Sequence, residues 1–127
     1  MKFEIFAIDD DKTICLLHKY VINLVYEQEP AIYLDARKAL DFFAKQTSDF
    51  KALIFLDINM PVMSGWAFLK ELEKFDYKER FSVVIVTSSV DIFDKKRANK
   101  FACVKGYIEK PLTKVKLTSL KANTDFI

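Results

Sequence analysis

Short apolar runs alternate with amphipathic stretches along the chain. The apolar runs predict buried β-strands at 3–8, 31–34, 53–56 and 83–86, and a fifth, shorter strand at 106–108. Runs that are apolar at nearly every position are typical of parallel strands buried on both faces of a sheet.

The stretches between these strands carry apolar residues at helical spacing. The predicted apolar faces are Ile14, Leu17, Val21, Leu24 and Val25 in a first helix, Ala39, Leu40 and Phe43 in a second, Phe68, Leu69, Leu72 and Phe75 in a third, and Leu112, Val115 and Leu120 in a fifth. A fourth helix, with a thin apolar face and many charges, is expected from about Asp91 to Ala102. Five strand–helix repeats indicate an α/β fold with a doubly wound, five-stranded parallel sheet.

Length and composition narrow the class of protein. A chain of 127 residues matches one domain, and with two glycines and three prolines it does not resemble a disordered chain. The apolar start is too short for a signal peptide, and no apolar run approaches the length of a membrane span. Cys15 and Cys103 lack metal-type spacing and are expected as core residues, which fits a cytoplasmic protein without membrane association. His18 has no ligand-type neighbours for zinc, and Trp66 is expected to pack.

Acidic side chains follow two of the predicted strands. Asp9, Asp10 and Asp11 come directly after the first strand, and Asp57 ends the third. Helix capping explains Asp11 well, but it explains three successive aspartates less well. Because the carboxyl ends of parallel strands meet at one edge of a sheet, the clustered carboxylates favour a site for a hard cation such as Mg²⁺.

Four segments, in order, resemble the signature of response regulator receiver domains. They are Ile8-Asp9-Asp10-Asp11, Leu56-Asp57-Ile58-Asn59-Met60-Pro61 through Gly65, Val86-Thr87-Ser88, and Tyr107-Ile108-Glu109-Lys110-Pro111. The resemblance covers essentially the whole chain. It implies the flavodoxin-like (βα)5 receiver fold, with a single receiver domain over residues 1–127 and no output domain.

The resemblance also implies a phosphoryl-acceptor site. Asp57 would accept a phosphoryl group from a histidine kinase or a phosphotransfer protein, as a switch rather than an enzyme. Mg²⁺ would be the cofactor, bound by Asp10, Asp57 and the backbone carbonyl of Asn59. Asp9 would help to bind it through water.

Three further residues receive roles from the same resemblance. Lys110 would pair with a phosphoryl oxygen, and the Lys110–Pro111 bond would be cis. Thr87 would donate a hydrogen bond to the phosphoryl group, and Tyr107 would swing inward behind it. The two residues together would switch a protein-binding face.

A phosphatase is the alternative reading. Asp9 to Thr13 also fits the Asp-x-Asp-x-Thr opening of haloacid-dehalogenase-type phosphatases, in which Asp9 would be the nucleophile. After Lys110 only Asp125 could supply a second acidic group, and the segment from Asp57 to Gly65 would have no role. A nucleotide-binding fold is less favoured still, because neither usual Gly-rich phosphate loop is present.

Charge is unevenly divided along the chain. Residues 95–127 carry nine Lys and Arg against two acidic residues, whereas residues 1–94 carry eleven against sixteen. The basic residues of this part are Lys95, Lys96, Arg97, Lys100, Lys105, Lys110, Lys114, Lys116 and Lys121. Receivers usually signal through their fourth and fifth helices, so the resemblance predicts a downstream protein with acidic side chains. The alternative interpretation is a basic surface that is only solvated and binds no partner. Nucleic acid is not expected as a partner because no binding module is present.

Overall fold

The computed structural model describes residues 3–47 and 49–123. The strands are β1 (Glu4–Ile8), β2 (Ala31–Tyr33), β3 (Ala52–Leu56), β4 (Phe81–Thr87) and β5 (Val104–Glu109). The helices are α1 (Lys12–Tyr26), α2 (Ala36–Ala44), α3 (Gly65–Leu72), α4 (Ile92–Ala98) and α5 (Lys114–Asn123), with a 3-10 helix, η1 (Lys78–Arg80), before β4. The predicted alternation of five strands and five helices is confirmed.

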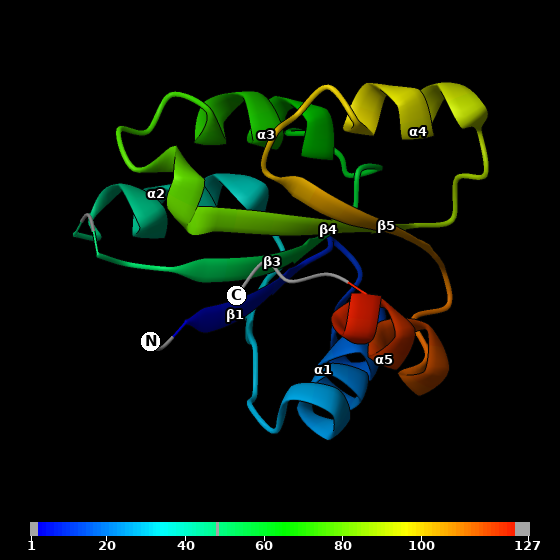
Figure 1. Cartoon of the computed structure of the whole chain (residues 1–127). Helices are drawn as coiled ribbons and strands as arrows, with labels where there is room; N and C mark the ends of the chain where they lie inside the picture. Colours follow the sequence, from blue (N-terminus) through cyan, green and yellow to red (C-terminus); the bar gives the residue numbers. More distant parts are fainter. Residues whose placement is uncertain (1–2, 48, 124–127) are drawn as a thin grey trace.

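The five strands form one parallel sheet in the order β2-β1-β3-β4-β5. Figure 1 shows α2, α3 and α4 on one face of the sheet and α1 and α5 on the other. The doubly wound α/β fold expected from the sequence is therefore present. The strand order changes direction beside β1, and sites in such sheets form beyond the carboxyl ends of the strands at that point.

The sheet separates two apolar cores. Every residue of β3 and β4 is buried, as expected for central strands covered on both faces. The core under α2 and α3 is rich in aromatic rings, and Phe6 meets Phe43 edge to face with centroids 4.9 Å apart. The second core packs α1 and α5 on the sheet around Ile22, Phe55 and Leu117. Burial on both sides holds the strand ends in fixed positions.

The predicted apolar face of α1 is wrong in part. Leu17 and Leu24 are exposed, whereas the buried positions are Cys15, His18 and Ile22. The Cys15 thiol donates to the carbonyl of Asp9 at 3.3 Å, which helps to set the rotation of the helix. Burial lowers the pKa of His18 to about 4, against the opposing effect of Asp9, so the imidazole is accommodated in the neutral form.

Three other helices also depart from the prediction. α3 ends at Leu72, so Phe75 of its predicted apolar face lies beyond the helix. Val115 of α5 is exposed, and Leu117 is buried in its place. The fourth helix ends at Ala98 rather than near residue 102, and Ala98 is its one buried residue. Asp91 caps α4 by accepting from Phe93 N–H, as a short polar residue at this position is expected to do.

Candidate functional site

Backbone hydrogen bonds continue beyond the strands and align their carboxyl ends. Asp57 N–H donates to the carbonyl of Ile8 at 3.0 Å, which fixes the end of β3 beside the end of β1. Lys110 N–H donates to the carbonyl of Thr87 at 2.8 Å, which fixes the residue after β5 beside the end of β4. Residues far apart in the chain are thereby brought to one edge of the sheet.

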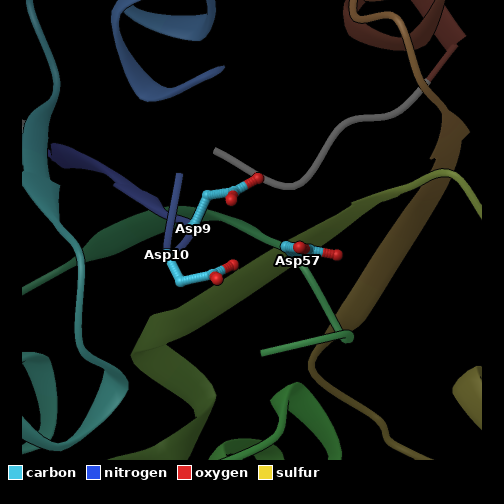
Figure 2. A group of neighbouring side chains, drawn as sticks. All are labelled: Asp9, Asp10 and Asp57. Atoms are coloured by element: carbon cyan, nitrogen blue, oxygen red, sulfur yellow. The ribbon is translucent and has the colours of Figure 1, made fainter. Parts of the chain in front are cut away.

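Three carboxylates gather at this edge. Figure 2 shows Asp9, Asp10 and Asp57 together at the ends of β1 and β3, and a carboxylate oxygen from each lies within 4.8 Å of the others. Asp9 and Asp57 are buried and Asp10 is exposed. Clustered oxygen ligands with a net negative charge are what Mg²⁺ prefers, so the donor set fits this ion.

One ammonium group contacts the cluster. Lys110 Nζ lies 2.8 Å from Asp9 Oδ2 and 3.5 Å from Asp57 Oδ2. Burial lowers the pKa of Lys110, but its pairing with Asp9 and Asp57 outweighs this and raises the pKa overall. Lys110 therefore stays charged, and its single positive charge leaves the three carboxylates undercompensated.

The surrounding backbone orients both buried carboxylates. Asp9 Oδ1 accepts from Asp11 N–H at 3.0 Å, and Asp57 Oδ1 accepts from Asn59 N–H at 3.1 Å. Burial raises the pKa of Asp57, while the Asn59 N–H and the Lys110 ammonium lower it less strongly. The folded protein thus stabilises the anionic form of Asp57 poorly, and an added cation would relieve this.

Capping accounts for one of the three successive aspartates. Asp11 Oδ1 accepts from the N–H groups of Thr13 and Ile14 at the start of α1. The carboxylates of Asp9 and Asp10 are instead part of the cluster. The capping interpretation is therefore correct for Asp11 alone.

Gly65 allows α3 to begin directly against the strand end that carries Asp57. A Cβ atom at Gly65 would lie 2.6 Å from the Cα of Ile58 and 2.7 Å from the carbonyl oxygen of Asp57. Gly65 N–H also donates to the carbonyl of Ile58 at 3.1 Å. Any larger residue would push the helix away from the end of β3. The preceding loop contains Val62 at φ 69°, a conformation that a β-branched residue rarely adopts.

The Thr87 hydroxyl is buried and accepts two hydrogen bonds. Asn59 Nδ2 donates to its oxygen at 3.4 Å, and Ser89 N–H donates at 3.3 Å. Among residues 3–47 and 49–123 no acceptor for this hydroxyl is found, so its hydrogen is available to donate to a further group. Tyr107, half-buried on β5, donates from its hydroxyl to the carbonyl of Ser89 at 3.3 Å.

Ser89 therefore joins Thr87 to Tyr107, a link that the sequence did not indicate. Its position two residues after Thr87 is the only signal in the sequence, and a serine after a strand has many other uses. The Lys110–Pro111 bond is cis, as expected. Beside it lies a groove lined by Ile14, Leu17, His18, Tyr20, Val21, Lys110, Pro111 and Leu112.

Several cations of the predicted basic face are used within the molecule. Lys116 Nζ donates to the carbonyls of Glu109 at 2.9 Å and Pro111 at 3.1 Å. The guanidinium of Arg97 lies 4.6 Å from the centre of the Trp66 ring. Lys96 and Lys100 of this face are exposed. In the part of the chain that the structure describes, no helix is long and apolar enough to cross a bilayer.

Comparison with known proteins supports the resemblance to response regulators independently of the site geometry. The probable transcriptional regulator ycf29 of Porphyra purpurea is 26% identical over 124 residues, which are 97% of this chain and 56% of that protein. The chain thus spans little more than half of this relative. A two-component response regulator from Cytophaga hutchinsonii has a TM-score of 0.83 and 25% identity, with 97% of each chain covered.

A second solved structure shows the fold alone. Chemotaxis protein CheY4 of Vibrio cholerae has a TM-score of 0.79 and 23% identity, covering 98% of this chain and 100% of that one. The comparisons do not support the phosphatase alternative with Asp9 as the nucleophile. The family model of the response regulator receiver domain matches residues 5–121. Because this match spans nearly all of the sequence, the chain belongs to the response regulator receiver domain family.

Proposed function

We propose that Asp57 is the phosphoryl acceptor of this receiver domain. One observation carries the proposal: the Asp57 carboxylate is buried at a strand end, grouped with Asp9 and Asp10, and lies 3.5 Å from the ammonium of Lys110. A carboxylate that attacks phosphorus approaches an anionic group, so positive charge must already be in place. Asp57 lies beside that charge and belongs to a set of carboxylates that could bind a cation.

The proposed reaction is a single transfer. A carboxylate oxygen of Asp57 forms a bond to phosphorus while the bond from phosphorus to the donor's leaving atom breaks, which yields an acyl phosphate. Asp10, Asp57 and the backbone carbonyl of Asn59 would hold Mg²⁺, with Asp9 helping through water. The ion would supply charge neutralisation for the phosphoryl oxygens. Lys110 would exchange part of its pairing with Asp9 for a phosphoryl oxygen.

Thr87 and Tyr107 are the proposed switch. The free hydrogen of the Thr87 hydroxyl is the group that a phosphoryl oxygen would attract, and Ser89 connects Thr87 to Tyr107. Two hydrogen-bonded arrangements of these residues would then differ in the surface that they present.

Two kinds of partner follow from this role. A histidine kinase or a phosphotransfer protein would supply the phosphoryl group, and the groove beside Lys110 is where we propose that the donor docks. Exposed Leu17 and Tyr20 provide apolar contact there. In this proposal the protein acts in the cytoplasm as an acceptor rather than as an enzyme with turnover.

The proposed output surface is the basic face around α4 and α5, where an acidic protein partner would bind. Steering by such a face raises the association rate and weakens as salt increases. Charge reversal at Lys96 and Lys100 should therefore slow association. Reversal at Lys116 is a poor test, because its ammonium holds two carbonyls of this chain.

The acceptor can be tested by intact mass after incubation with a small phosphodonor and Mg²⁺. The natural protein should gain one phosphoryl group, Asp57→Asn should gain none, and Asp41→Asn, an exposed carboxylate on α2, should behave like the natural protein. Labelling of Asp57→Asn together with loss of labelling in Asp9→Asn would refute the proposal and revive the phosphatase alternative.

A further inference from the structure

One side-chain pair fastens the first turn of α4 to the segment that follows β4. The Ser89 hydroxyl donates to Asp94 Oδ2 at 2.6 Å and accepts from Asp91 N–H at 3.3 Å. Ser89 and Asp94 are both half-buried, so the bond between them is partly shielded from water. A short hydrogen bond to an ionised carboxylate is stronger than one between neutral groups.

The main chain of Ser89 reaches both residues of the proposed switch. Its N–H donates to Thr87 Oγ1 at 3.3 Å, and its carbonyl accepts from Tyr107 Oη at 3.3 Å. Ser89 therefore contacts Thr87, Tyr107 and α4 through three different groups. A displacement of Thr87 or Tyr107 can therefore reach α4 through Ser89.

Apolar burial does little to hold α4 in place. Of its seven residues only Ala98 is buried, and the side chains of Ile92 and Phe93 are 60% and 73% exposed. Most of the stability of a helix in a protein comes from packing of an apolar face. The polar contacts of α4 thus matter more than usual, namely the Ser89 bond and the cations of Lys95 over Tyr107 and Arg97 over Trp66.

We propose that Asp94 is a positioning residue of the switch. Through the Ser89 hydroxyl, Asp94 holds α4 to the strand end that carries Thr87, so that movement of the Thr87 hydroxyl toward a phosphoryl group moves α4 as well. The coupling to phosphorylation rests on the proposed function, whereas the fastening of α4 exists without any phosphodonor.

Amide hydrogen exchange of residues 92–98 in the absence of phosphodonor tests the fastening. Ser89→Ala and Asp94→Ala should each raise the exchange rates by about fivefold or more. The double variant should exceed neither single variant by much, because both remove the same bond. Ser89→Thr keeps the hydroxyl and should exchange like the natural protein. Exposed Ser88→Ala and Lys96→Ala are matched controls in the same loop and helix.

If the effects of Ser89→Ala and Asp94→Ala on the exchange rates added up in the double variant, the two residues would not hold α4 through a shared bond. That result would refute this part of the proposal. So would a Ser89→Thr variant that exchanges as fast as Ser89→Ala, or controls that reproduce the increase. Far-UV circular dichroism of each variant distinguishes a local release of α4 from a failure to fold. If Ser89→Ala does not fold, the exchange rates of Ser89→Thr decide the test.

Trp66 fluorescence tests the coupling. Trp66 is the single tryptophan, and the Arg97 guanidinium of α4 lies over its ring, so its emission reports the position of α4. With a small phosphodonor and Mg²⁺, the emission change per phosphorylated molecule, counted by intact mass, should fall to half or less in Asp94→Ala and Ser89→Ala. Ser89→Thr should retain it.

A full emission change in phosphorylated Asp94→Ala would refute the coupling. If the natural protein gained no phosphoryl mass, the proposed function would fail instead. The exchange experiment would then still decide whether Asp94 and Ser89 fasten α4.

Discussion

The ammonium of Lys110 pairs more closely with Asp9, at 2.8 Å, than with the proposed acceptor Asp57, at 3.5 Å. Asp9 is buried, and Lys110 comes 101 positions later in the chain. The pair thus ties the first strand end to the segment after the last strand. Asp9 therefore holds the lysine beside the proposed acceptor.

The first prediction concerns this pair. Lys110→Met should lower the free energy of unfolding by about 2 kcal/mol in the absence of Mg²⁺, because it leaves a buried carboxylate without its partner. The Lys110 side chain is 18% exposed, so solvent moderates the loss. Urea unfolding measures it, with Lys96→Met on exposed α4 as the control. Equal stabilities of the two variants would show that the Lys110–Asp9 pair contributes nothing.

The second prediction concerns the cation. Mg²⁺ at about ten times its dissociation constant should stabilise the natural protein by roughly 1.4 kcal/mol. Asp10→Asn should reduce this gain, and because Asp10 is exposed the substitution should not disturb the core. Thermal melts over a Mg²⁺ titration check it against Asp41→Asn. Undiminished stabilisation of Asp10→Asn would remove that residue from the binding set.

The third prediction follows from the raised pKa of Asp57. Burial makes the anionic form of this carboxyl unfavourable in the folded state, so Asp57→Asn should stabilise the Mg²⁺-free protein at neutral pH. The same variant should lose much of the stabilisation by Mg²⁺. Chemical unfolding without and with Mg²⁺ measures both effects. A less stable Mg²⁺-free variant would contradict the prediction.

The fourth prediction concerns His18 and pH. Burial lowers the pKa of His18 from 6.5 to about 4, so between these values the unfolded chain binds the proton more readily than the folded protein. Stability should therefore rise with pH across this window and fall on acidification, by at most about 3 kcal/mol from this residue. His18→Leu should flatten that part of the pH profile. Parallel profiles for the two proteins would show that His18 does not contribute.

The fifth prediction compares two glycines. A Cβ at Gly65 would meet backbone atoms of residues 57 and 58, whereas a Cβ at Gly106 would meet Leu120 Cδ1 at 2.8 Å. A side-chain end can rotate away and a strand end cannot, so Gly65→Ala should cost about 2–3 kcal/mol and Gly106→Ala clearly less. Gly65→Ala should also slow phosphorylation. Equal costs would contradict this reasoning.

The sheet and the site edge could be predicted because they depend on short-range patterns. Parallel strands bring their carboxyl ends together, so Asp9, Asp57 and Lys110 had to approach one another once the strands were assigned. The rotation of α1 could not be predicted in the same way. Apolar residues surround much of this helix, and its period does not reveal that a histidine is buried while Leu17 is exposed.

The hydrogen-bond networks between side chains could not be predicted from the sequence either. The bond between Ser89 and Asp94 depends on how the segment after β4 turns into α4, and no residue spacing encodes that geometry. The same holds for the basic face. The number of lysines predicted the charge of this face. Only the structure shows that the Lys116 ammonium donates hydrogen bonds to two backbone carbonyls.

The two outer strands of the sheet bear on how the protein avoids aggregation. An outer strand with free backbone groups can recruit a strand of another molecule and start a fibre. Here β2 has only three residues, and β5 carries the exposed charges of Lys105 and Glu109. A second chain would find too short a template on one side and would have to bury charge on the other. The shortness of β2 and the exposed charges of β5 therefore protect this fold from growing edge to edge.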